Sequence, residues 1–139
     1  MTRRLSRKLV RKRSIWIWLS TEVRPRVLFP QRVKSRATAA ELQTWALNCL
    51  RSWDTNYQYY PQPITNIHSA VRGLWIHGPM AVMYLASDRD TEHVMVYYGG
   101  GGCGHWGMEI GPTNRPLPLS GQGRRYTAWA PGVCFFDGQ

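Results

Sequence analysis

The sequence has little cysteine, and its basic N-terminal part has no long apolar run. Three of the 139 residues are cysteine, and the nearest two are separated by 30 residues. An odd number at this spacing does not indicate a disulfide scaffold, so we expect a reducing compartment, the cytoplasm by default. The apolar stretch from Ser14 to Ser20 is too short for a membrane span, which needs about 20 residues. We therefore expect no transmembrane segment.

Common motifs for metals and phosphates are also missing. The sequence has no CxxC and no HExxH. Its glycine-rich stretch has neither the Gly-Lys-Ser/Thr ending of a phosphate loop nor the spacing of a dinucleotide fingerprint. A metal site would have to combine Cys103 and His105 with His93 or Cys134, and these residues do not form a paired ligand motif. We therefore expect no metal and no cofactor.

Acidic residues are scarce near the N-terminus, where positive charge is concentrated. The chain has a formal net charge of +10. Residues 1–36 hold 12 of the 18 Lys and Arg residues and one of the eight acids, so this segment carries +11 and residues 37–139 carry −1. The sequence therefore predicts a basic, poorly ordered arm at 1–36 and a single domain at 37–139.

The composition of the arm suits three roles. Clustered Arg and Lys side chains neutralise phosphates and release counterions, which favours contact with a nucleic acid or another anionic surface. An Arg-rich, acid-poor segment is also typical of a cleaved organelle import signal. The third possibility is that the arm has no function, because sequence translated from a misplaced start codon would have a similar composition. We expect nucleic-acid contacts from Arg3, Arg4, Arg7, Lys8, Arg11, Lys12 and Arg13.

The hydrophobic pattern of the body predicts an α+β fold. Thr38 and Glu41 have the spacing of a capping box, and apolar residues recur behind it at helical spacing as far as Trp53. Segments typical of strands follow at 74–76, 81–86, 92–98, 105–110 and 132–136. We expect one amphipathic helix packed on a four- to five-stranded antiparallel meander, with loops at 57–67 and 111–125.

The most unusual stretch is the run of glycines around Cys103, from 99 to 104. Glycines allow positive φ and close backbone approach, so this segment is either a ligand loop or a plain hairpin connection. Strand alternation places His105 and Glu109 on one face, and a hairpin centred on the glycines would bring Tyr98 near His105. His105 is then a candidate general base, and the alternative is an ordinary surface histidine.

The segment from 94 to 111, VMVYYGGGGCGHWGMEIG, resembles one stretch of NlpC/P60-type cysteine peptidases and their relatives, the LRAT-like acyltransferases. In those enzymes a glycine-rich loop precedes a His-x-Gly-x-x-x-Gly strand, matched here from His105 to Gly111, whose histidine is the catalytic base. Their nucleophile lies at a helix N-terminus, where the dipole lowers the thiol pKa. Cys49 instead lies near the C-terminal end of its predicted helix, which leaves Cys103 as the candidate nucleophile.

We therefore expect a small non-enzymatic binding or assembly protein whose cationic arm contacts an anionic partner, RNA being one candidate. The first alternative is a hydrolase or acyltransferase that uses His105, Cys103 and Glu109. The second is a protein-interaction module, for which aromatic residues in loops would supply the surface.

Overall fold

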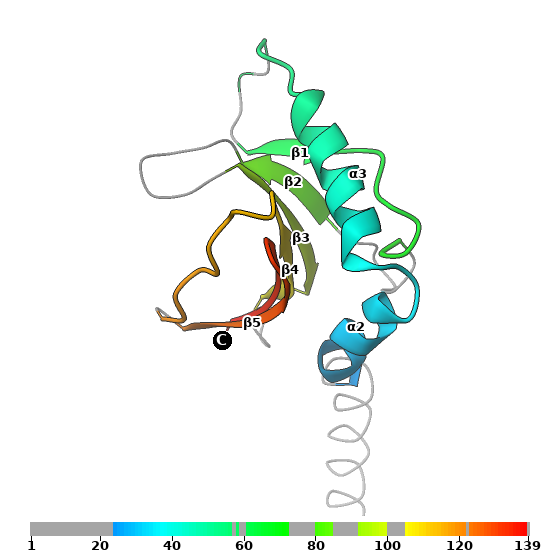
Figure 1. The fold of residues 1–139 in the computed structure, drawn as a ribbon, viewed down its shortest axis with the longest axis vertical. Helices are drawn as coiled ribbons and strands as arrows, with labels where there is room; N and C mark the ends of the chain where they lie inside the picture. The colour runs from blue at the N-terminus through cyan, green and yellow to red at the C-terminus, as the bar shows by residue number, and fades with distance from the viewer. Residues whose placement is uncertain are drawn as a thin grey trace, which may run out of the picture.

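The described part of the chain forms two helices and one sheet. The computed structural model describes residues 24–56, 58, 61–72, 80–84, 92–99, 105–121 and 123–138. The helices are α2 (Arg24–Lys34) and α3 (Ala39–Arg51). The strands are β1 (Gln62–Ile64), β2 (Met80–Tyr84), β3 (His93–Gly99), β4 (Trp106–Ile110), β5 (Arg124–Ala130) and β6 (Val133–Gly138). Figure 1 shows both helices on the same side of the sheet. The predicted α+β class is confirmed.

The sheet is antiparallel, and its strand order is β1-β2-β3-β4-β6-β5. From β1 to β4 the strands follow one another as in a meander. β6 then pairs with β4, and β5 occupies the edge, so the prediction of a simple meander is wrong at the last hairpin. β1 lies in a segment predicted as a loop, because prolines dominate the local pattern there, and β5 lies mostly between the predicted loop at 111–125 and the predicted last strand. Pro63 in β1 is tolerated because β1 is the other edge strand. The expected strand at 74–76 lies outside the described residues.

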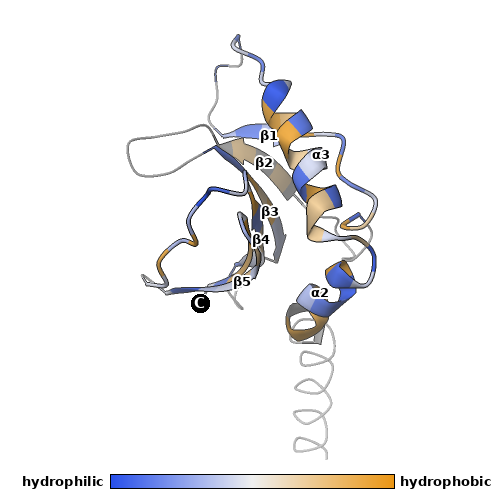
Figure 2. Cartoon of the chain, viewed as in Figure 1, coloured by the Kyte–Doolittle hydropathy of each residue, from blue (hydrophilic) through white to orange (hydrophobic). Residues whose placement is uncertain are grey.

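Helix α3 begins with the predicted capping box. The Thr38 backbone N–H donates to Glu41 Oε2 over 2.6 Å, and the Glu41 N–H donates to Thr38 Oγ1 over 3.2 Å. The backbone N–H groups of Thr38 and Glu41, at the start of α3, therefore both have hydrogen-bond acceptors. Leu42, Ala46 and Leu50 form the buried stripe, and Figure 2 shows α3 divided between hydrophobic and hydrophilic residues.

Helix α2 corrects the prediction for the arm. Residues 24–34 are helical, and Phe29 and Val33 are 3% and 0% exposed. They lie four residues apart, which is one helical turn, so both point into the core. The ring of Phe29 packs 4.2 Å from that of Tyr98, measured between centroids. The expectation of a poorly ordered arm is therefore wrong for this part, because the high charge obscured a short apolar face. Residues 1–23 lie outside the described part.

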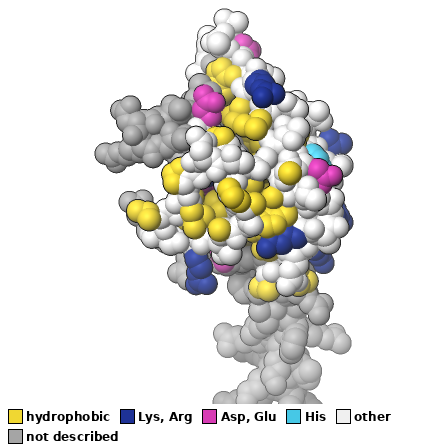
Figure 3. Space-filling model, viewed as in Figure 1, with side chains coloured by type: hydrophobic (Ala, Val, Ile, Leu, Met, Phe, Trp, Pro, Cys, Tyr) yellow, Lys and Arg dark blue, Asp and Glu magenta, His cyan; other side chains and the backbone are white. Residues whose placement is uncertain are grey.

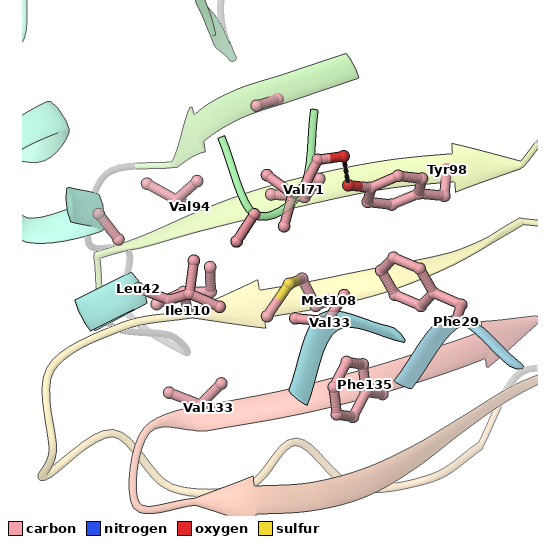
Figure 4. Close-up of a cluster of buried hydrophobic side chains, with 14 of the residues drawn as sticks. Phe29, Val33, Leu42, Val71, Val94, Tyr98, Met108, Ile110, Val133 and Phe135 are labelled. Atoms are coloured by element: carbon pink, nitrogen blue, oxygen red, sulfur yellow. Dashed lines mark hydrogen bonds between the residues drawn. The ribbon is translucent and has the colours of Figure 1, made fainter. Parts of the chain in front are cut away.

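The main core lies between the helices and one face of the sheet (Figure 4). The strands contribute alternate residues, among them Val94, Val96, Met108, Ile110, Val133 and Phe135. The Tyr98 hydroxyl donates to the backbone oxygen of Val71, which ties the segment before β2 to β3. Gln43 of α3 donates to the carbonyl of Pro131 over 2.8 Å and so holds the β5–β6 turn. In that turn Gly132 has φ +77°, a conformation that glycine adopts without strain.

Candidate functional site

The face of the sheet turned away from the helices holds polar and aromatic side chains. Residues 111–121, which we call the strap, run from β4 to β5 on this side of the sheet (Figure 1). Glu109 lies on this face, as strand alternation predicted, whereas its neighbours Met108 and Ile110 lie in the main core. The strap and this sheet face together form the candidate functional site.

Glu109 is held in a buried ion pair. Its side chain is 2% exposed, and Arg115 Nη2 donates to its Oε2 over 2.7 Å. Arg124 Nη1 lies 4.0 Å from the other carboxylate oxygen. Arg115 comes from the strap, where a turn closed by its own N–H and the carbonyl of Pro112 directs it back over the sheet. Because two guanidinium groups balance the carboxylate, the burial of Glu109 carries no uncompensated charge.

His105 is exposed, and its ring lies against Tyr97, with 6.4 Å between the centroids. We expected Tyr98 in this position. The β3–β4 ladder has an irregularity between Tyr97 and Gly99, and it pairs Tyr97 with Gly107. Tyr98 continues the alternation of Val94 and Val96 and therefore points into the core, whereas Tyr97 shares the outer face with His105. The prediction that Tyr98 lies near His105 is wrong, because it did not take this alternation into account.

The structure bears on the catalytic alternative at several residues. Cys103 lies outside the described residues. Burial, followed by the charge of Glu109, raises the pKa of Cys134 to about 11, and burial also raises the pKa of Cys49. These two thiols are therefore protonated near neutral pH and are poor nucleophiles. His105 and Glu109 are four residues apart on one strand, about 13 Å along it, so they do not form a contact pair.

Three aromatic side chains form a transverse row across this face, and we call it the aromatic row. The ladders place Tyr97 of β3, Gly107 of β4, Phe136 of β6 and Tyr126 of β5 directly opposite one another. The ring of Phe136 lies 5.7 Å from that of Tyr97 and 6.5 Å from that of Tyr126.

Gly107 makes this row continuous. A Cβ atom at this position would collide with the backbone oxygen of Val96 and would lie 2.9 Å from the Phe136 ring. The notch that a glycine leaves on the strand is therefore occupied by Phe136. The rings of β3 and β6 can approach each other only because β4 has no side chain between them.

Arg124 covers the middle ring of the aromatic row. Its guanidinium lies 4.9 Å from the centroid of Phe136, and its Nη1 lies 3.5 Å from the Tyr126 hydroxyl. Beside it is a hollow of about 530 Å³, lined by Leu119, Ser120, Gly121, Arg124 and Tyr126. The next residue along β5, Arg125, is exposed on the other face of the strand. Aromatic surface and the Arg124 charge therefore lie together on this face, at the edge of the sheet.

A second, apolar hollow lies under the middle of the strap. It has a volume of about 300 Å³ and is lined by Arg115–Pro118 of the strap and Ala128–Cys134 of the β5–β6 hairpin. In Figure 3 hydrophobic side chains gather in the middle of the face shown, with Lys and Arg side chains at the margins. Lys34 of α2 borders this region, with its Nζ 5.7 Å from the centroid of Trp129.

The aromatic row was missed in the sequence. Residues 124–130, RRYTAWA, alternate enough to suggest a strand, but Tyr126 meets Phe136 and Tyr97 only through the ladders.

The predicted nucleic-acid contacts from Arg3 to Arg13 lie outside the described residues. Among the residues that the structure describes, no group of three or more His, Cys, Asp and Glu side chains is placed to hold a metal ion. No helix within the same residues has the length and hydropathy needed to cross a membrane.

Comparisons of the chain with models of protein families, with curated proteins and with solved structures found no match. The resemblance to NlpC/P60-type peptidases therefore rests on the segment around His105 alone. Inferences about function depend on the residues of this chain and on their geometry.

Proposed function

We propose that this protein is a non-enzymatic binding protein that holds an anionic partner, RNA, with its basic arm. The observation that supports the proposal is the segregation of charge. Residues 1–36 carry +11, while the remaining 103 residues are almost neutral at −1. Such a block neutralises several phosphates at once, and the release of their counterions drives binding.

The attachment of the arm to the body adds support. Phe29 and Val33 bury one face of α2 in the core, while Arg32, Lys34 and Arg36 remain exposed. Lys34 Nζ lies over the rings of Trp129 and Phe135, at 5.7 and 5.5 Å from their centroids. The C-terminal part of the basic segment, residues 24–34, is thus packed on the body beside β5 and β6.

The test compares the full-length protein with a variant in which seven arm residues become glutamine. These are Arg3, Arg4, Arg7, Lys8, Arg11, Lys12 and Arg13. The matched control is the double variant Arg51→Gln/Arg72→Gln, which removes exposed charges from the body. Binding of a fluorescein-labelled single-stranded RNA is followed by anisotropy at several KCl concentrations.

Each phosphate contact contributes about 0.7 to the slope of log K against log salt for a single strand. The arm variant should therefore lose up to ~5 from this slope and bind much more weakly, while the control keeps the slope of the wild type. Equal affinity and equal slope in the arm variant and the wild type would refute the proposal. Deletion of residues 1–36 is a poorer test, because it removes the core residues Phe29 and Val33.

A further inference from the structure

The aromatic row differs from the aromatic residues of the main core in what covers it. Tyr98, Trp106 and Phe135 pack under the helices. Tyr97 and Tyr126 lie on the opposite face, where each is only partly buried, and the ring beyond Tyr97 is that of exposed His105. The small cluster around Met95 and Phe136 has no helix over it in the part of the chain that the structure describes. Phe136 is only 2% exposed, so the rings that the row presents at the surface are those of Tyr97 and Tyr126, on either side of it.

The charges around the row are positive or balanced. Arg124 lies over Phe136 and its side chain is 31% exposed, whereas Arg125 points to the other face of the edge strand, opposite Asp137. Glu109, the acid on this face, is paired with Arg115 at 2.7 Å. On this face an anionic ligand therefore meets the Arg124 guanidinium, and the Glu109 carboxylate is already neutralised by Arg115.

Rings next to guanidinium groups are the chemistry that binds unpaired nucleotides. Bases stack on aromatic faces regardless of their identity, and arginine contacts the phosphates or stacks on a base. A duplex hides its base faces in its own stack, so it cannot use such a surface. The row crosses four strands, with neighbouring centroids 5.7, 6.5 and, on the His105 side, 6.4 Å apart. It thus offers rings for more than one base.

We propose that the aromatic row is a stacking site for the bases of a single-stranded nucleic acid, with Arg124 holding a phosphate. This inference rests on the proposed function, and it names the form of the partner: a single strand, not a duplex. The arm supplies charge without regard to sequence or strandedness. The row supplies the preference for unpaired bases.

The experiment measures anisotropy with the full-length protein and three labelled probes of equal length: oligouridylate, oligothymidylate and a blunt RNA duplex. The variants are Tyr97→Leu and Tyr126→Leu, which keep apolar bulk but remove the ring. The matched controls are Tyr97→Phe and Tyr126→Phe, which keep the ring and remove only the hydroxyl. The seven-glutamine arm variant is measured beside them.

Loss of one stacked base weakens binding by about 5-fold or more. Each leucine variant should therefore bind both single strands at least ~5-fold more weakly, while its affinity for the duplex and its salt slope stay at the wild-type values. The phenylalanine variants keep the ring and should therefore lose much less affinity than the leucine variants. Leucine variants that bind single strands as the wild type does would overturn the stacking site, as would an equal loss on the duplex.

The two proposals fail in different ways. If the arm variant retains wild-type binding but the leucine variants do not, the role of the arm is wrong and the row stands. If only the arm variant loses affinity, the row is wrong and the arm stands.

A cross-linking readout on the wild type does not depend on whether any variant folds. Oligouridylate carrying 5-iodouridine is irradiated in complex with the full-length protein, and the cross-linked peptides are mapped by mass spectrometry. Cross-links at Tyr97, His105 or Tyr126 support the stacking site. Cross-links confined to residues 1–36 overturn it.

Discussion

Replacement of Arg115 by methionine tests the Glu109–Arg115 ion pair, the most deeply buried one in the described part of the chain. Methionine keeps most of the apolar stem of arginine and removes the guanidinium, so packing changes little. Glu109 then loses the charge-assisted bond of 2.7 Å while its side chain stays 2% exposed. Removing one partner of a buried pair costs about 3–5 kcal/mol, because the other charge is left without compensation.

The remaining arginine sets the magnitude within that range. Arg124 is 4.0 Å from the other oxygen of Glu109 but is 31% exposed, so water screens its charge. We therefore expect Arg115→Met to lower the free energy of unfolding by about 3 kcal/mol, and Glu109→Leu, which leaves the Arg115 charge buried, to lower it by a similar amount. The double variant Glu109→Leu/Arg115→Met leaves no buried charge at this place and should lie within ~1 kcal/mol of the wild type.

The assay is urea unfolding at neutral pH, followed by far-UV circular dichroism and repeated in low and high salt. The two single variants and the double variant complete a thermodynamic cycle, and we expect a coupling free energy of about 5 kcal/mol that salt barely changes. A loss below ~1 kcal/mol in Arg115→Met, or additive effects of the two substitutions, would show that the pair is not buried as described.

Two further predictions concern the main core and the face of the sheet that is turned away from the helices. Phe29→Ala should lower the free energy of unfolding by about 3–5 kcal/mol, because it leaves a cavity between α2 and the sheet. The control Val27→Ala, at a side chain that is 65% exposed, should change it by less than ~0.5 kcal/mol. Equal effects of the two substitutions in urea unfolding would contradict the packing of α2. Burial raises the pKa of Cys134 to about 11, so the thiol ionises at a lower pH in the unfolded chain than in the folded one. The free energy of unfolding should therefore fall by up to ~3 kcal/mol as the pH rises from about 9 to 11. Cys134→Ala should lose less stability over the same interval, and identical pH profiles would refute this cause.

Local patterns in the sequence predicted the elements that local interactions determine. The Thr38 and Glu41 capping box and the apolar stripe behind it depend on residues within one or two turns, so α3 was predicted nearly to its ends. The alternation from His105 to Ile110 likewise placed Glu109 on the correct face. In both cases, residues close in sequence determine the structure.

The missed features depend on partners that are distant in sequence. Tyr126, Phe136 and Tyr97 become neighbours only because β6 lies between β4 and β5, and nothing near any of them in sequence indicates that order. The ion pair of Glu109 requires the turn that brings Arg115 back over the sheet. The short apolar face of α2 was hidden for another reason, since Arg and Lys dominate its composition.

The position of β6 also has a consequence for how the chain folds during synthesis. β5 comes before β6 along the chain, but in the sheet β6 is its only strand neighbour and joins it to β4. As the chain emerges from the ribosome, β5 therefore appears before the strand on which it must pair, and Tyr126 has no ring beside it until Phe136 follows. The helices and β1 to β4 can assemble in order of synthesis, whereas the aromatic row forms in one late step.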